Sequence, residues 1–151
     1  MVENAASKYC FPEVSFRSKE WNLDGKKVLE IIIPKSEEIP HKAPDTNNKP
    51  KAYIRYQDQN ILANGIQMKI WQKTNNNKDI KFVYSDEARE LLALFTADKS
   101  LLLRHIISKT KISRFKTESM LADLVIMKVL IMQVDELSAS FLLNEAVEKD
   151  Y

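Results

Sequence analysis

The chain contains 151 residues, of which 23 are lysine or arginine and 21 are aspartate or glutamate, giving a formal net charge of +2. Its only two glycines, Gly25 and Gly65, stand far apart, which excludes the glycine-rich loops that cradle phosphates. Cys10 cannot form an internal disulfide, and together with His41 and His105 it is too little for a zinc cage. We therefore expect a globular protein without a metal or other cofactor.

The apolar segments are too short to cross a membrane. The longest, residues 124–132, is interrupted by Lys128 and has roughly half of the about 20 residues that a transmembrane helix needs. The N-terminal residues lack the basic and apolar regions of a signal peptide. We expect a cytoplasmic protein, and the lone cysteine suits a reducing compartment.

Residues 14–34 are predicted to form a β-hairpin. Two β-compatible runs flank Asp24-Gly25, a pair that readily adopts the positive φ angles of a tight hairpin turn. The second run, Val28 to Ile33, is apolar except for Glu30. A strand of this composition is typically covered on both faces, so we expect it in the centre of a sheet.

The next stretch is predicted to run from loop to strand to helix. Residues 34–51 hold four of the five prolines and predict a long surface loop. Residues 52–56 resume β character. Asn60 is a suitable N-cap, and apolar residues at helical spacing after it predict a helix over residues 61–73.

Residues 74–79 are polar and lack periodicity, which predicts a linker between a β-rich part at 1–73 and a second domain at about 80–145, with a tail at 146–151. Helices are expected in the second domain over residues 86–97, after Ser85 as N-cap, and over residues 101–109, after Ser100 or Asp98. A further helix should begin after Ser113.

The last part of the chain completes a recognisable pattern. The inner face of the helix after Ser113 is expected to carry Phe115, Leu121, Leu124 and Val125. Residues 129–143 are typical of strand, turn and strand around Asp135-Glu136. Three helices followed by a hairpin predict a winged helix-turn-helix, and with the β-rich part an α+β fold.

The second domain has a basic segment where a helix-turn-helix meets DNA. Residues 99–116 include basic side chains and no acid, and they span the second helix, the turn and the start of the third helix. We expect this face to meet phosphates and the major groove, with an ordinary solvated surface as the alternative. The predicted DNA contacts are Lys99, Arg104, Lys109, Lys111, Arg114 and Lys116, with Ser113, Arg114, Lys116 and Thr117 placed to reach base edges.

Other charges argue against DNA binding. The third helix also carries Glu118 and Asp123, and the wing has Asp135-Glu136 at its tip, which DNA phosphates would repel. An enzyme is not expected either, because no serine lies in a Gly-x-Ser-x-Gly motif and Cys10 has no histidine nearby in the sequence. We interpret both histidines as structural.

Residues 125–132 carry more apolar side chains than one helix face and one strand face need. Ile126, Met127 and Met132 are left over, and clustered surplus apolar residues usually form an interface. We expect a homodimer through this surface. The alternative is that the β-rich part packs over it within one chain.

The segment VLEIIIPKSEEIPHKAP and the later KAYIRYQDQNILA resemble the C-terminal half of the Schlafen-type, Alba-like DNA-binding domain. Pro34, Pro40-His41 and Tyr53-Ile54-Arg55 follow in the order typical of that family. In bacteria this domain often precedes a winged helix, to which residues 85–143 are similar. The likeness extends from about Lys8 to Leu143.

The resemblance implies a DNA-binding transcriptional regulator and makes Arg55 a candidate nucleic-acid contact, with a salt-bridging strand residue as the alternative. The family's N-terminal half has no counterpart here, so we expect a truncated form without nuclease or nucleotide-binding activity. Two other functions stay open: a protein-interaction or oligomerisation module of a larger regulator, and a fragment of a Schlafen-related nuclease or ATP-binding protein.

Overall fold

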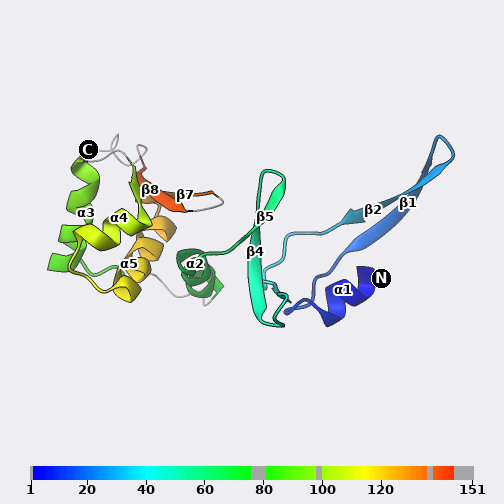
Figure 1. Ribbon diagram of the computed structural model, residues 1–151, viewed down its shortest axis with the longest axis horizontal. Helices are drawn as coiled ribbons and strands as arrows, with labels where there is room; N and C mark the ends of the chain where they lie inside the picture. The colour runs from blue at the N-terminus through cyan, green and yellow to red at the C-terminus, as the bar shows by residue number, and fades with distance from the viewer. Residues whose placement is uncertain (1, 76–80, 98–99, 136–137, 145–151) are drawn as a thin grey trace. The chain divides into compact units, whose positions relative to one another are not determined.

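A computed structural model describes residues 2–75, 81–97, 100–135 and 138–144 of the chain. It combines helices with antiparallel sheets, which confirms a mixed α+β fold (Figure 1). The chain divides into two compact units, Met1–Tyr53 and Ile54–Tyr151. None of the helices in the described part is long and apolar enough to span a membrane.

The first unit begins with helix α1 (Val2–Lys8) and continues into strands β1 (Arg17–Leu23) and β2 (Lys26–Ile32). The strands form the predicted hairpin, in which Leu23 lies opposite Lys26. The turn residues Asp24 and Gly25 have φ angles of 50° and 77°, so the predicted turn chemistry is confirmed.

The expectation that this hairpin contributes a covered central strand is wrong within the first unit. All seven residues of β1 and all seven of β2 are exposed. The two strands form a sheet of their own, so β2 is an edge strand rather than a central one. Apolar composition on both faces of the strand predicted a cover that the described residues of the first unit do not supply.

The predicted loop over residues 34–51 contains a short strand, β3 (Lys42–Pro44), which pairs antiparallel with β4 (Pro50–Tyr56). The Asp45 carboxylate closes the connection, because its Oδ1 accepts hydrogen bonds from the backbone N–H groups of Asn47 and Lys49, each at 2.8 Å. Strand β5 (Gln59–Leu62) follows, and the strand order is β3-β4-β5.

Helix α2 (Gly65–Asn75) begins later than predicted. Its cap is Asn64, whose Oδ1 accepts from the N–H groups of Ile66 at 3.0 Å and Gln67 at 2.9 Å. Asn60, the predicted cap, lies in β5 instead. Ile66 is fully buried in the core of the second unit, so α2 belongs to that unit, which begins at Ile54. Most of the predicted linker, residues 76–79, lies outside the described residues.

The rest of the second unit consists of α3 (Asp86–Ala97), β6 (Leu101–Leu102), α4 (Leu103–Lys109), α5 (Arg114–Ile126), β7 (Leu130–Val134) and β8 (Ala139–Leu143). The strand order is β6-β8-β7, all antiparallel. The predicted helix over 86–97 and the predicted hairpin are confirmed.

Two of the three predicted helix starts agree with the structure. Ser85 Oγ accepts from the N–H of Ala88 at 3.2 Å, and Ser113 Oγ accepts from the N–H of Lys116 at 3.4 Å. Helix α4 differs, because its N-cap is Leu102, without a side-chain hydrogen bond. Ser100 is therefore not its cap, and the alternative Asp98 lies outside the described residues.

The hydrophobic core lies between the helices and the three-stranded sheet of the second unit. The large side chains of Leu91, Ile106, Leu121, Leu124 and Phe141 are at most 2% exposed. Phe141, in the central strand β8, lies opposite Leu101 on one side and Met132 on the other. This core fixes α4, α5 and β8 against one another and so positions the side chains considered next.

Candidate nucleic-acid interface

The first turn of α5 projects from the second unit. Arg114, Phe115 and Lys116 are all exposed there, directly after the Ser113 cap. The cap satisfies one of the backbone N–H groups that a helix leaves unpaired at its start. This end of the helix therefore has a fixed backbone that carries accessible side chains.

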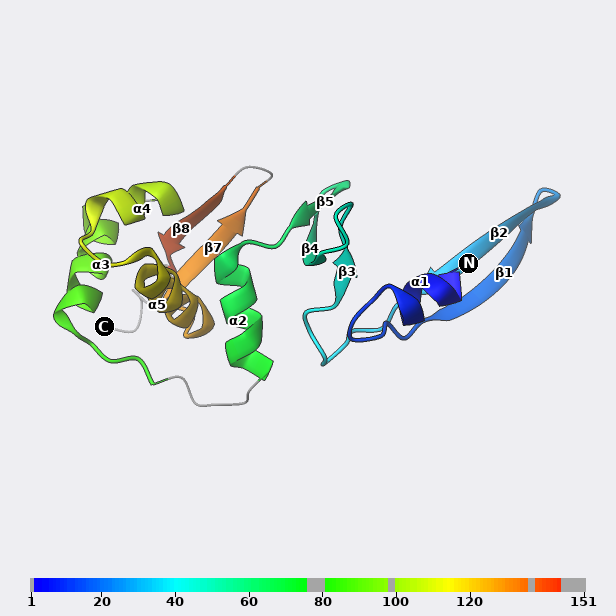
Figure 2. The same ribbon diagram turned by 60° about the horizontal axis from the view of Figure 1, so that its bottom comes forward.

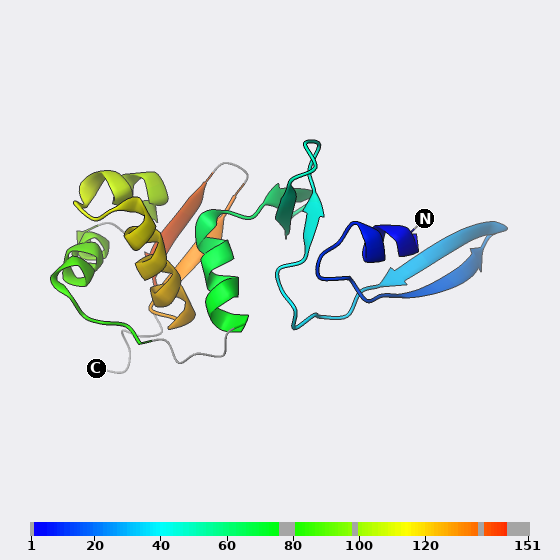
Figure 3. The same ribbon diagram turned by 90° about the horizontal axis from the view of Figure 1, so that it is seen from below.

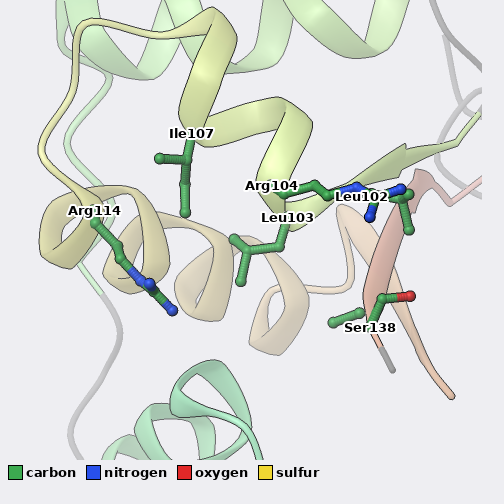
Figure 4. A pocket seen from close by; sticks show the side chains of 7 residues that line it. Leu102, Leu103, Arg104, Ile107, Arg114 and Ser138 are labelled. Carbon is green, nitrogen blue, oxygen red and sulfur yellow. The ribbon is translucent and has the colours of Figure 1, made fainter. Parts of the chain in front are cut away.

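An open depression of about 350 Å³ lies beside this turn, between α4, α5 and the start of β8 (Figure 4). Its apolar lining is Leu102, Leu103, Ile107 and Ala139. The polar lining consists of Arg104, Arg114 and Ser138, from α4, α5 and the turn before β8. The fold thus brings together two of the predicted contacts from different helices, and adds Ser138.

The two arginines stand at opposite ends of the depression. In Figure 4, Arg104 extends towards the β7–β8 hairpin and Arg114 extends along α5. Arg114 Nε donates to Glu118 Oε1 at 2.9 Å, yet 73% of the Arg114 side chain remains exposed. Guanidinium groups with this exposure suit an anionic partner that carries more than one charge, such as a nucleic-acid backbone.

The turn of the β7–β8 hairpin is closed by an acid. Asp135 Oδ1 accepts from the Ser138 N–H at 2.7 Å, and the Asp135 N–H donates to the Ser138 carbonyl at 3.0 Å. The Ser138 hydroxyl also lies 3.1 Å from Asp135 Oδ1. Asp135, which the sequence placed at a repulsive wing tip, therefore has a structural role in the turn; Glu136 lies outside the described residues.

The basic segment does not form a single face. Arg114 and Lys116 are two residues apart and so about 200° apart around α5. Lys116 Nζ forms an ion pair with Glu87 of α3, and the Lys111 N–H donates to Glu90 Oε1 of the same helix at 3.0 Å. These two lysines lie on the α3 side, whereas Arg104 and Arg114 line the depression. Lys109 is exposed at the end of α4, and Lys99 lies outside the described residues.

Helix α2 packs along α5 (Figures 2 and 3). Lys69 Nζ lies 3.4 Å from Glu118 Oε2, and Lys73 Nζ lies 2.6 Å from Asp123 Oδ1. Lys73 also donates to Ser119 Oγ at 2.9 Å. The two acids that seemed to oppose DNA binding are therefore partners of α2.

This packing limits how much of α5 is open. Ser119 and Asp123 lie about 100° or more around the helix from Thr117 and Leu124, which point into the core. The middle of α5 is thus enclosed between the core and α2. Within α5 only the residues of its first turn are exposed, and Met127 is exposed at the C-cap.

Two assignments on α5 are reversed in the structure. Thr117, predicted to reach a base edge, has a fully buried side chain, so it cannot contact DNA. Phe115, predicted to lie in the core, is 75% exposed, with Lys69 Nζ 4.1 Å from its ring centre. Thr117 is four and seven residues from Leu121 and Leu124, on the same helix face, whereas Phe115 is nine residues from Leu124, about 180° away.

We predict that Thr117→Val raises the free energy of unfolding by about 1 kcal/mol, because the buried Thr117 Oγ1 has no hydrogen-bond partner among the described residues. Thr110→Val is the matched control. Thr110 is also buried, but its hydroxyl donates to the Ile106 carbonyl at 3.1 Å. We therefore expect Thr110→Val to lower the free energy of unfolding by about 1 kcal/mol. Chemical denaturation of both variants measures the difference. Equal destabilisation of the two would contradict the assignment.

The predicted apolar interface is partly used inside the chain. Met132 packs against the core, and Ile126 is half-buried. Met127, the C-cap of α5, is 45% exposed. The surplus therefore shrinks mainly to Met127, and a dimer through this surface stays a prediction.

The remaining candidate residues have local partners. Arg55 in β4 lies 3.9 Å from Asp58 Oδ1 and 3.4 Å from Asn60 Oδ1, with 60% of its side chain exposed. His41 Nδ1 lies 2.8 Å from the Pro12 carbonyl, which agrees with a structural role, whereas His105 is exposed on α4.

The part of the chain that the structure describes contains no cluster of three or more histidine, cysteine or acidic residues able to hold a metal ion.

Comparisons with known proteins complete the description of this site. A scan against protein-family models, a search of curated proteins and a search of solved structures each found no match.

Proposed function

We propose that the protein binds double-stranded DNA through a winged helix-turn-helix formed by α3 to β8, and that it acts as a transcriptional regulator without catalysis in this chain. The order of elements supports the proposal: α3, β6, α4, α5 and then the β7–β8 hairpin, with strand order β6-β8-β7. The turn between α4 and α5 is short, as a helix-turn-helix requires.

The observation that carries the proposal is the depression lined by Arg104, Arg114 and Ser138. The three side chains come from the second helix, the start of the third helix and the wing, which are the elements that contact DNA in winged helices. Both arginines are exposed, so binding a phosphate would cost them little desolvation. Arginine also matches the geometry of phosphate oxygens and of guanine edges.

The packing of α2 determines the mode of contact. A recognition helix that lies along the major groove would need the middle of α5, which is covered. We infer that α5 approaches DNA with its first turn, so that Arg114 is the residue placed to reach a base edge. Arg104 and Ser138 then bind the backbone, and Phe115 is an exposed ring beside the contact.

The variant Arg104→Gln, Arg114→Gln tests this proposal. We predict that it weakens binding to a short DNA duplex by about tenfold or more, because two charge-assisted hydrogen bonds to DNA are lost. The matched control is Lys111→Gln, Lys116→Gln, which removes the same charge on the α3 side and should change the affinity less. Fluorescence anisotropy at low salt measures both, and equal losses would contradict the assignment of the depression as the contact.

The first unit supports a second role, as a partner-binding part of the same regulator, because its exposed apolar hairpin has no cover among the described residues of that unit. We also retain as a proposal the relationship to the Schlafen-type, Alba-like domain. Its support is the order in this chain of an apolar strand before Pro34, the His41 loop and the Tyr53-Ile54-Arg55 strand.

A further inference from the structure

The first unit lacks a hydrophobic core among its described residues. Only Ala6 and Ala52 are buried apolar side chains there. Most of the large apolar residues of this unit are instead exposed to solvent, from 39% for Ile31 to 78% for Phe11, and Val14, Phe16 and Ile39 are half-buried. Ordering a chain of this length costs more free energy than two buried alanines can offset, so the unit needs a partner to cover it.

The hairpin is apolar on both of its faces. Residues directly opposite each other share a face, so Trp21 and Val28 lie on one side, together with Leu23 and Ile32. Leu29 and Ile31 lie on the other side. Strand β2 therefore carries apolar side chains on both faces, which is typical of a strand in the middle of a sheet.

The outer edge of β2 is the place where a further strand is missing. The sheet contains β1 and β2 alone, so the second edge of β2 has no strand partner among the described residues. An isolated two-stranded hairpin is marginally stable in water, and a third strand is normally needed. Leu23 and Lys26 flank a two-residue turn, which makes them a hydrogen-bonded pair of the hairpin. Along an antiparallel strand, backbone groups point alternately to the neighbouring strand and away from it. The N–H groups of Lys27 and Leu29 therefore point to the free edge.

We propose that β2 pairs with β2 of a second copy of this chain, antiparallel about a two-fold axis at Val28, to form a four-stranded sheet. In this register Lys26 lies opposite the partner's Glu30, and Glu30 lies opposite the partner's Lys26. The pairs fall at non-hydrogen-bonded positions, where side chains are closest. Val28 meets the partner's Val28 between the two charge pairs.

The charge pattern selects this pairing over its neighbours. Registers centred on Lys27 or Glu30 would place identical charges opposite each other, and the register centred on Leu29 forms no charge pair. On the outer edge of β1, the bases Arg17 and Lys19 point to one face and the acid Glu20 to the other. A two-fold pairing of β1 strands can therefore never place a base opposite an acid.

Charge reversal in the full chain tests the interface. Lys26→Glu places a new carboxylate opposite the partner's Glu30, and Glu30→Lys places a new ammonium group opposite the partner's Lys26. Each variant alone should therefore dimerise about tenfold or more weakly than the natural chain. An equimolar mixture of the two variants should form a heterodimer, since every facing pair is then of opposite sign. The double variant Lys26→Glu, Glu30→Lys should recover the homodimer.

The mixture and the double variant separate an interface from a folding effect. Lys26 and Glu30 are four residues apart along one strand, about 13 Å, and cannot compensate each other within one chain. Glu30 also accepts a hydrogen bond from Trp21 Nε1 at 2.8 Å, which Glu30→Lys removes in every combination. Sedimentation equilibrium at micromolar concentration is the readout. A monomeric natural chain, or single variants that dimerise normally, would overturn the proposal without affecting DNA binding by the second unit.

Discussion

Phe141→Ala is expected to lower the free energy of unfolding of the second unit by about 3–5 kcal/mol. Phe141 is fully buried in the central strand β8, where it lies opposite Leu101 and Met132. Truncation leaves a cavity between the sheet and the helices, because the surrounding structure can move only partly into the vacated space. The midpoint of thermal unfolding should fall by about 4–8 °C for each kcal/mol lost.

Phe115→Ala makes the same chemical change at an exposed position of the same unit. Phe115 is 75% exposed and contacts Lys69 through its ring face, so we expect a loss of about 1 kcal/mol or less. Denaturant titrations of both variants give the comparison. Similar losses at the two positions would mean that the core is not where the structure has it.

Glu118→Ala is expected to lower the free energy of unfolding by about 3 kcal/mol, the second largest effect. The Glu118 side chain is only 12% exposed, and it accepts from Arg114 Nε and pairs with Lys69. A Cβ atom on Gly65 would lie 3.1 Å from Glu118 Oε2, so α2 begins close against this carboxylate. Without it, the 16% exposed Lys69 side chain loses its counter-charge and α2 loses its attachment to α5.

Asp86→Ala provides the control for a charge pair outside the core. Asp86 pairs with Arg89 at 2.7 Å, but their side chains are 92% and 68% exposed, so the loss should be about 0.5 kcal/mol or less. Because Asp86 also stands at the start of α3, part of that loss belongs to the helix dipole. A Glu118 variant as stable as the Asp86 variant would contradict the attachment of α2 through this pair.

Local chemistry made several elements predictable from the sequence. Asp24-Gly25 specifies a hairpin turn, and Ser85 and Ser113 specify helix starts, because each acts on backbone groups within a few residues. The two β-compatible runs on either side of Asp135-Glu136 likewise correspond to β7 and β8. These signals do not depend on the rest of the chain.

Long-range packing decided the features that the sequence did not reveal. Asn60 and Asn64 are equally good caps by type, and the burial of Ile66 in the core favours the second. The pairs of Lys69 and Lys73 with α5 join residues about fifty positions apart, for which no local pattern exists. Those contacts make the middle of α5 an internal surface and leave open its first turn, where the DNA contacts on this helix were predicted.

The reversal of Phe115 and Thr117 has a different cause. Residue type favoured the aromatic side chain for the core, whereas the spacing from Leu121 and Leu124 favours Thr117. Helix geometry prevailed over hydrophobicity at this turn. The candidate site gained an exposed aromatic ring and lost a predicted base contact.

The salt dependence of DNA binding tests the central claim most directly. For the natural chain and the Arg104→Gln, Arg114→Gln variant, the logarithm of the affinity for one duplex is plotted against the logarithm of the salt concentration. Each phosphate contact contributes about 0.9 to the magnitude of the slope. Loss of the Arg104 contact should therefore make the variant's slope smaller in magnitude by about 0.9. The decrease should reach about 1.8 if Arg114 also meets a phosphate. Identical slopes, or no binding by the natural chain at low salt, would contradict the account.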